Sequence, residues 1–211
     1  MKIKEQTRKL AAGCSKHCFE VVDRTDEVSS KHRFEVVDRT DEVSSKHRFE
    51  VADIAIVAAI YVVLTVTPPL NAISYGAYQF RISEMMNFMA FYNPKYIIGV
   101  TIGCMIANFF SFGLLDVFVG GGSTLVFLSL GVWLFAKYSK DYLFNGLIRK
   151  DHFFFSILFS ISMFTIAAEL NIVAELPFFL TWFTTGIGEF ASLIIGAIII
   201  GKIGRRIDLS K

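Results

Sequence analysis

Two opposite charges stand three residues apart in an apolar part of the chain, within the stretch YGAYQFRISEMMNF at residues 75–88. On a helix, Arg81 and Glu84 would share one face, because side chains three positions apart are neighbours there. An ionised side chain in the middle of a bilayer costs roughly 2.5–3.5 kcal/mol, so such groups face protein or water and mark a path for a ligand or ion. The alternative interpretation is an ion pair that fixes the end of a helix.

Further polar residues in apolar surroundings predict one substrate-binding cluster together with this pair. Glu189 in TTGIGEF is flanked by apolar residues, and Gly186 and Gly188 would let a helix or a flat ligand approach closely. Simpler roles are open for two others, because Trp182 suits an interfacial belt and Asn108 suits a hydrogen bond between helices. The predicted substrate-binding residues are Gln79, Arg81, Glu84, Asn108, Glu169, Trp182 and Glu189.

These residues form no pattern that catalysis requires. His152 is the one histidine after residue 51, and neither a Ser/His/Asp arrangement nor a two-histidine metal pattern occurs. The stretch CSKHC at residues 14–18 fits no standard zinc spacing and has no second pair of ligands. We therefore expect binding or transport rather than an enzyme, with no metal and no other cofactor.

The composition places these residues in a membrane. The chain has 211 residues, of which 54% are hydrophobic, and residues 1–50 hold 21 of its 40 Lys, Arg, Asp and Glu side chains. Several apolar runs in the remainder approach the ~20 residues that a spanning helix needs. A soluble domain would not carry so many long uncharged runs. The sequence therefore predicts an all-α, multi-pass protein of the cell (plasma) membrane.

Six apolar segments predict six transmembrane helices, at residues 54–66, 80–92, 96–112, 114–138, 152–169 and 178–203. The second segment is short for a bilayer, so either it extends into the preceding loop or its outer end lines a cavity. With both termini in the cytoplasm, nine Lys and Arg side chains lie inside and Arg81 alone lies outside. Merging the second and third segments would place a basic cluster outside, which favours six spans.

The first fifty residues form a polar extension ahead of a membrane domain at residues 51–211. KHCFEVVDRTDEVSS at 16–30 is followed by KHRFEVVDRTDEVSS at 31–45. Each copy carries too little apolar area to offset the entropy of ordering, so the extension is predicted to be disordered or loosely helical. It is similar to translated copies of the intergenic BOX repeat elements of streptococci, which implies a genomic accident or a misassigned start.

Small residues line one side of the first predicted span, ADIAIVAAIYVVL. Ala55 and Ala59 form a small-xxx-small pair, which lets another helix approach closely in lipid. The opposite side, with Tyr61 and Leu64, is bulky. The alanine pair is therefore a candidate docking face.

Residues 52–203 resemble a known family of membrane proteins. A six-helix domain with a first-helix AxxxA pair and no ATPase motif is similar to the substrate-binding S components of energy-coupling-factor (ECF) transporters. Within that group, three stretches resemble the QueT family, which is proposed to import queuosine precursors. They are TPPLNAISYGAYQFRISEMM, GCMIANFFSFGLLDVFVGG and LPFFLTWFTTGIGEF.

The resemblance implies a mechanism and a set of partners. An S component captures its small-molecule substrate outside the cell, docks its AxxxA face on a transmembrane coupling subunit, and releases the substrate inward. Two partner ATPase subunits would hydrolyse ATP, because this chain has no P-loop: GGGS at 120–123 lacks the following Lys. Ala55 and Ala59 would contact the coupling subunit, and no nucleic acid is implied.

A 7-deazaguanine substrate suits the polar cluster. Its guanine-like edge presents donors that a carboxylate accepts, so we expect Glu84 and Glu189 to be the main acceptors. Gln79 and Asn108 would read the carbonyl and ring nitrogens. Arg81 would hold Glu84 in position. The aminomethyl form of such a base is also a cation, which an acidic pocket favours.

Two further parts of the site and several alternatives complete this hypothesis. Trp182 would stack on the flat base, and the loop at residues 68–79 would serve as a lid. The alternatives are an S component for another vitamin or nucleobase, a solitary proton-coupled carrier, and an integral membrane enzyme. The carrier would use Glu84, Glu169 and Glu189 as its relay, although Glu169 would have a simpler role in a solvated outer loop.

Overall fold

The structure is a computed structural model that describes residues 48–75, 79–111 and 113–209. Its two compact units are Met1–Phe49 and Glu50–Lys211, and the second unit holds the elements that position the site. The tandem repeats and the CSKHC stretch lie outside the described residues. The described part of the first helix runs from Arg48 to Val66.

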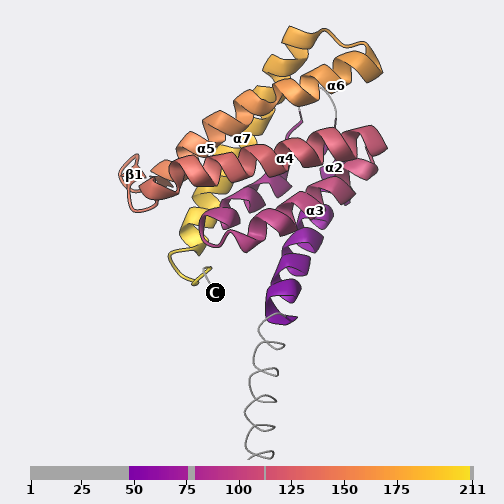
Figure 1. The fold of residues 1–211 in the computed structure, drawn as a ribbon. Coiled ribbons are helices and arrows are strands. Elements are labelled where there is room, and N and C mark those ends of the chain that lie inside the picture. Colours follow the sequence, from indigo (N-terminus) through magenta and orange to yellow (C-terminus); the bar gives the residue numbers. More distant parts are fainter. Residues whose placement is uncertain (1–47, 76–78, 112, 210–211) are drawn as a thin grey trace, which may run out of the picture. The chain divides into compact units, whose positions relative to one another are not determined.

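Four helices in the described part of the chain are long and apolar enough to cross a membrane (Figure 1). They are Arg48–Val66, Leu114–Tyr138, Lys150–Ala174 and Phe178–Ile203. A further apolar helix, α3 (Lys95–Phe109), is shorter. The architecture agrees with the predicted class of all-α membrane protein.

Two of the long spans have the predicted limits. α4 (Leu114–Phe135) continues into the 3-10 helix η2 (Ala136–Tyr138), and α7 covers Phe178–Ile203. Gly113 precedes α4 with a φ of +76°, and Pro177 precedes α7. Glycine accepts a positive φ without strain, and proline is tolerated at a helix start, where its missing N–H leaves no bond unmade. Both residues mark these boundaries in the sequence itself.

The fifth predicted span is longer than expected and consists of two helices. α5 (Lys150–Ser162) and α6 (Phe164–Ala174) meet at Met163, so the span exceeds the predicted residues 152–169 on both sides. Near the junction, the Ser162 hydroxyl donates a hydrogen bond to the carbonyl three residues earlier. Side chains that bond to the backbone in this way often bend helices.

The second predicted span is a 3-10 helix, η1 (Ile82–Phe91), rather than an α-helix. At ~2.0 Å per residue it is about 20 Å long, against a hydrocarbon core of about 30 Å. Gln79 precedes it with a φ of +31°, and Arg81 has an extended backbone. The predicted helical face shared by Arg81 and Glu84 is therefore wrong, because Arg81 lies before the helix. The N-terminal end of η1 lines a cavity, which is one of the two outcomes that the sequence analysis predicted for this short segment.

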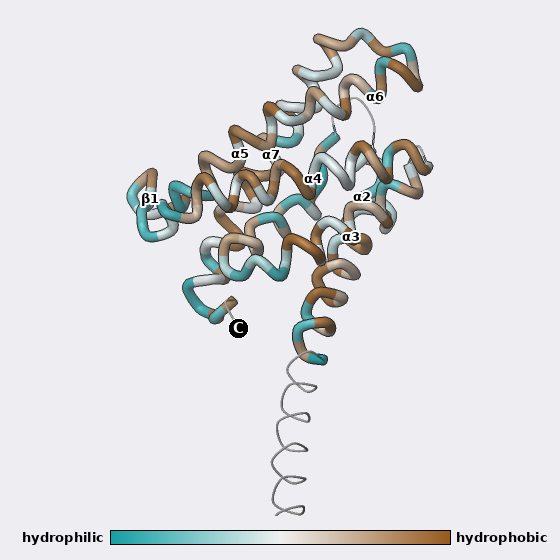
Figure 2. The backbone as a smooth tube through the Cα atoms, in the orientation of Figure 1, coloured by the Kyte–Doolittle hydropathy of each residue, from teal (hydrophilic) through white to brown (hydrophobic). Residues whose placement is uncertain are grey.

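Short elements join the long helices. α2 (Leu70–Ser74) follows the first helix, and β1 (Tyr142–Leu143) pairs antiparallel with β2 (Ile148–Arg149) between η2 and α5. Figure 2 shows hydrophilic residues gathered at the β1 hairpin and at the C-terminal end of the chain. The two regions lie together, because Arg205 donates a hydrogen bond to the backbone carbonyl of Gly146 in the hairpin.

Two glycines of α3 let the first helix pack closely against it. A Cβ at Gly99 would lie 2.8 Å from the carbonyl oxygen of Ile54, and a Cβ at Gly103 would lie 2.8 Å from the Cβ of Tyr61. Small residues at this spacing permit close helix packing in lipid. The contact within the chain is thus made by a glycine pair that the sequence analysis did not single out.

Apolar side chains cover the outside of the bundle, while charged groups are buried in it. Trp133 and Phe179 are 78% and 77% exposed, whereas Glu84 and Glu189 are 3% and 1% exposed. Soluble monomers rarely expose large contiguous apolar areas. This distribution fits a bundle surrounded by lipid, in which polar groups turn toward protein.

Candidate functional site

A small polar cavity lies where the N-terminal end of η1 meets α3, α4, α5, α6 and α7. Its volume is about 10 Å³, which is close to the minimum that a single water molecule needs. The polar side chains in its wall are Gln79, Arg81, Glu84, Ser123, Thr124 and Glu189. The other wall residues are Cys104, Gly120, Phe159, Met163 and Ile166. Four of the seven predicted substrate-binding residues therefore line one cavity.

Glu84 is held at the cavity wall by two uncharged donors. Its Oε1 accepts a hydrogen bond from the Tyr61 hydroxyl at 2.5 Å, and its Oε2 accepts one from the Asn87 amide at 2.6 Å. Tyr61 reaches the site from the first helix, and Asn87 lies one turn further along η1. The carboxylate is thus fixed in place without an opposite charge in direct contact.

Arg81 is fixed by carbonyl oxygens and not by a carboxylate. Its Nη1 donates to Oδ1 of Asn108 at 3.0 Å, and its Nε donates to the backbone carbonyl of Ser74 at 3.1 Å. The expectation that Arg81 holds Glu84 in position is therefore wrong. Because Arg81 lies in the extended segment before η1, its side chain reaches α3 instead. The two groups interact as charges across the cavity wall.

Tyr75 ties the segment after α2 to α3 beside the cavity. Its hydroxyl donates to the backbone carbonyl of Ala107 at 2.7 Å, and the guanidinium of Arg81 lies 5.5 Å from its ring centroid. Burial raises the pKa of the Tyr75 phenol above its ordinary value, so the hydroxyl remains a donor at neutral pH. Residues 76–78 of the predicted lid lie outside the described residues.

Asn108 lies behind Arg81, and a glycine makes room for it. A Cβ at Gly120 would lie 2.0 Å from Nδ2 of Asn108. The same nitrogen donates to the backbone carbonyl of Asp116 at 3.3 Å and to the sulfur of Cys104 at 3.4 Å. The amide lies next to the cavity wall without forming part of it. Through these contacts, Asn108 holds the Arg81 side chain against α3.

Glu189 brings a second carboxylate to the cavity from α7. Its Oε1 is buried and has no hydrogen-bond partner in the described part of the chain. Glu84 and Arg81 are the charged groups that act on it. One turn further along α7, the Ser192 hydroxyl donates to the backbone carbonyl of Arg81 and so fixes α7 against the segment before η1. A buried acceptor without a donor is costly, and Glu189 can therefore accept hydrogen bonds from a ligand.

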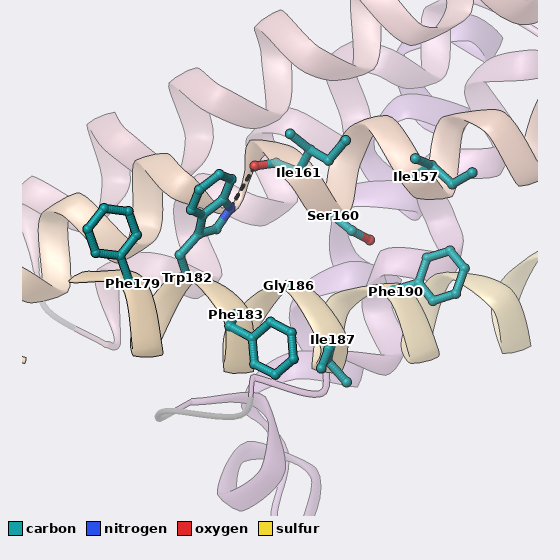
Figure 3. Close-up of a pocket in the computed structure, with 9 residues that line it drawn as sticks. All are labelled: Ile157, Ser160, Ile161, Phe179, Trp182, Phe183, Gly186, Ile187 and Phe190. Carbon is teal, nitrogen blue, oxygen red and sulfur yellow. Dashed lines mark hydrogen bonds between the residues drawn. The ribbon is translucent and has the colours of Figure 1, made fainter. Parts of the chain in front are cut away.

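The two remaining predicted residues lie outside the cavity wall. Glu169 is buried in α6, so its placement in a solvated loop is wrong. Trp182 donates its indole N–H to the backbone carbonyl of Ile161 at 3.0 Å (Figure 3). Its ring packs against Phe178, with 6.0 Å between the ring centroids. The structure does not bring this indole to the polar cavity.

Trp182 instead forms part of an apolar groove between α5 and α7 (Figure 3). The groove has a volume of about 470 Å³ and is lined by Ile157, Ser160, Ile161, Phe179, Trp182, Phe183, Gly186, Ile187 and Phe190. Phe179 and Phe183 are largely exposed. A surface of this kind suits the acyl chains of lipid better than a polar base.

The predicted docking pair lies on a bare side of the first helix. Ala55 and Ala59 are exposed, so nothing in the described chain covers them. Ala58 is buried beside Gly103 of α3, on the other side of the same helix. The first helix thus has one side packed inside the bundle and one side open to another molecule.

Comparison with known proteins identifies a related family. The QueT transporter family matches residues 51–205, which contain the cavity and the alanine pair. The chain belongs to the QueT transporter family. A curated relative, the queuosine precursor transporter QueT of Lactococcus lactis subsp. cremoris (strain MG1363), is 67% identical over 158 residues, which cover 75% of this chain and 94% of the relative. No solved structure gives a significant match.

QueT membership confirms the family predicted from three stretches of sequence. Together with the long apolar helices, it identifies a multi-pass membrane protein of a transporter family. The family match begins at residue 51, so the tandem repeats lie outside it.

The side chains that the sequence analysis missed include three that form hydrogen bonds at this candidate site: Tyr61, Asn87 and Ser192. A signal existed for each. A tyrosine on the packed side of a membrane helix needs a partner for its hydroxyl. Asn87 and Ser192 each follow a predicted carboxylate by three residues, the spacing that places side chains on one helix face.

Proposed function

We propose that this QueT-family chain is the substrate-binding S component of an ECF-type importer. It captures a queuosine precursor, a 7-deazaguanine base, outside the cell, and a coupling subunit with two ATPase subunits drives release inward. The observation that carries the proposal is the pair of buried carboxylates, Glu84 and Glu189, at one cavity of an apolar-surfaced bundle. The identity to a queuosine precursor transporter supports the substrate class.

The cavity wall offers the groups that a guanine-like ring needs. Glu84 and Glu189 supply acceptors for its N–H donors, and a carboxylate oxygen can accept more than one hydrogen bond. Gln79 can donate its amide to the ring carbonyl. Arg81 uses only Nε and Nη1 for contacts within the described chain, so Nη2 is a further donor. Asn108 positions Arg81 in this scheme.

The base enters only after the cavity widens, because a volume of about 10 Å³ does not hold a bicyclic ring. Two hydrogen bonds hold the preceding loop against the site, from Tyr75 to the Ala107 carbonyl and from Arg81 to the Ser74 carbonyl. Their opening would release the loop at residues 68–79. The proposal therefore keeps this loop as the lid.

The proposal includes six spans with both termini in the cytoplasm. Four helices have membrane-spanning length, and α3 and η1 provide two shorter crossings of roughly 20 Å each. Irregular or short crossings are tolerated where protein surrounds them. The buried side chains of η1, such as Phe88 and Ala90, meet that condition. Nine of the ten basic residues after residue 51 then lie on the cytoplasmic side.

Docking on the coupling subunit takes place through Ala55 and Ala59. Both are exposed and small, so a partner helix can approach the backbone closely. On the opposite side of the same helix, Tyr61 donates to Glu84 in the cavity. The first helix therefore connects the docking face to the substrate site.

Binding to the purified chain tests the substrate class. Titration calorimetry with a 7-deazaguanine base should show binding, and Glu189→Gln should weaken it about tenfold or more, because hydrogen bonds to a charged acceptor contribute roughly 1.5–3 kcal/mol. Glu175→Gln is the control, since Glu175 is exposed after α6 and should leave affinity unchanged. If no 7-deazaguanine binds the unsubstituted chain, the substrate claim is wrong.

Reconstitution in liposomes tests the S-component assignment separately. Uptake of the bound base should require the coupling subunit, both ATPases and ATP. Uptake by this chain alone would instead identify a solitary carrier.

A further inference from the structure

Glu169 is a buried acid that the proposed ring-binding groups do not use. It lies in α6 and is 4% exposed. Neither of its carboxylate oxygens accepts a hydrogen bond in the described part of the chain. An ionised carboxylate in such surroundings is costly unless a donor or a positive charge reaches it. The side chain that lies beside it is a second acid, Asp116, so the pair favours a ligand that brings a positive charge.

This carboxylate lies one helical turn beyond the cavity. Ile166 of α6 and Gly120 of α4 both belong to the cavity wall. Glu169 follows Ile166 by three residues and Asp116 precedes Gly120 by four, spacings that keep each pair on one helix face. α4 and α6 pack against each other, and Asp116 and Arg81 are the charged groups that act on Glu169.

The charges around Glu169 favour a positively charged guest. Four buried carboxylates, those of Glu84, Asp116, Glu169 and Glu189, accompany the single guanidinium of Arg81. Its Nε and Nη1 bind the Ser74 carbonyl and the Asn108 amide, and no hydrogen bond joins the guanidinium to Glu169 in the described part of the chain. Among the described residues of this region, acidic side chains thus outnumber basic ones, which favours a ligand that carries a positive charge.

The class of cation follows from the number of ligands available. No group of three or more His, Cys, Asp and Glu side chains suited to a metal ion occurs among the residues that the structure describes. An alkylammonium group needs fewer protein ligands than a metal ion, because its three N–H donors can each bind one carboxylate oxygen. Two facing carboxylates on α4 and α6 suit such a group.

We propose that Glu169, together with Asp116, forms a subsite for a protonated amine carried by the substrate outside its ring system. The proposal rests on the proposed uptake of a 7-deazaguanine and adds which ring substituent the chain selects. The ring edge binds Glu84 and Glu189, and the substituent extends toward Glu169 at the end of the cavity. Bases with a cationic arm are then preferred over bases of similar size with a neutral one.

Two ligands with the same ring test this preference: 7-aminomethyl-7-deazaguanine, whose arm is a cation at neutral pH, and 7-cyano-7-deazaguanine, whose arm is neutral. Calorimetry on the full-length chain should show the amine binding about tenfold more tightly, as expected for a charge-assisted hydrogen bond. Glu169→Gln should weaken amine binding by about the same factor and leave nitrile binding unchanged. Glu175→Gln should keep the preference.

The possible outcomes distinguish a failure of the amine subsite from a failure of the proposed function. Equal affinity for the two ligands, or an equal loss of both in Glu169→Gln, would overturn the subsite and leave the substrate class standing. Failure of both ligands to bind the unsubstituted chain would overturn the proposed function and the subsite with it. Asp116→Asn provides a second variant and should also reduce the preference for the amine. Nitrile binding by each variant shows that it is folded.

Discussion

The charged residues of the cavity are held by uncharged neighbours. Glu84 accepts hydrogen bonds from Tyr61 and Asn87, and Arg81 donates to the amide of Asn108. A direct ion pair between Arg81 and Glu84 would satisfy both charges and reduce their attraction for a ligand. Uncharged partners fix the geometry of each group and leave its charge available. This arrangement favours binding over a purely structural role.

The position of Asn108 depends on the absence of a side chain at Gly120. In Gly120→Ala, the new Cβ would lie 2.0 Å from Nδ2 of Asn108 and would displace the amide that holds Arg81. We expect substrate affinity to fall at least about tenfold, the loss expected for one hydrogen bond to a charged group. Calorimetry measures the effect.

Gly122→Ala is the matched control for this change. It lies in the same helix, and a Cβ there would have no neighbour within 4 Å. Alanine also favours helix more than glycine does, so this variant should bind normally. Normal binding by Gly120→Ala as well would show that Asn108 does not position Arg81.

The sequence revealed the charged residues of the cavity but not the groups that hold Glu84. Arg81, Glu84 and Glu189 could be found because charge is rare and costly in apolar segments. Tyr61 could not be paired with Glu84, because 23 residues separate them and only the fold brings them together. Trp182 was assigned to ligand stacking from its residue type, although aromatic rings serve equally well in packing between helices.

Among the elements, the first helix has two sides with different surroundings. Its packed side meets Gly99 and Gly103 of α3, and its open side carries Ala55 and Ala59. Tyr61 extends from the packed side to Glu84. A movement of this helix at the proposed docking face would therefore also move a group that holds Glu84, the carboxylate proposed to bind the substrate.

A bulky residue on the open side should separate binding from uptake. In Ala55→Trp or Ala59→Trp, the indole would block the approach of a partner helix and leave the cavity intact. We expect calorimetric affinity for the base to stay within about twofold and uptake in liposomes with the coupling module to be lost. Val126→Trp, at an exposed position of α4, is the control and should transport normally. Full uptake by both alanine variants would exclude docking through this face.

The limits of α4 and α7 could be predicted because glycine and proline mark them, whereas the type of η1 could not. A short apolar segment gives the same pattern of residues for an α-helix and for a 3-10 helix. The extended backbone at Arg81 is accompanied by contacts of this residue with α2, α3 and α7, which the sequence does not display. The prediction therefore placed Arg81 inside the helix, although this residue lies just before it.

For the whole molecule, the surrounding lipid provides the apolar environment that the protein interior provides in a soluble fold. The apolar surface of the second unit and its buried acids follow the same rule, that each group lies where its solvation is least costly. The family match covers this unit and leaves the tandem repeats out. Transport should therefore need only the membrane domain.

Removal of residues 2–47 tests that requirement. The described part of the first helix starts at Arg48, so this deletion leaves every described element in place. We expect the same affinity for the base and the same rate of uptake as in the full chain, measured in the reconstituted system. A clear loss of uptake with intact binding would assign the repeats a role in assembly with the partners.

The burial of the Cys104 thiol makes this shortened chain suitable for cysteine-labelling experiments. It lies in the cavity wall, is 1% exposed, and contacts the Thr124 hydroxyl at 3.4 Å. Maleimide reagents need an accessible thiolate, so the folded protein should not react at this position. The deletion also removes Cys14 and Cys18. Single cysteines introduced into the loops would then report which side of the bilayer each loop occupies, against a background without labelling.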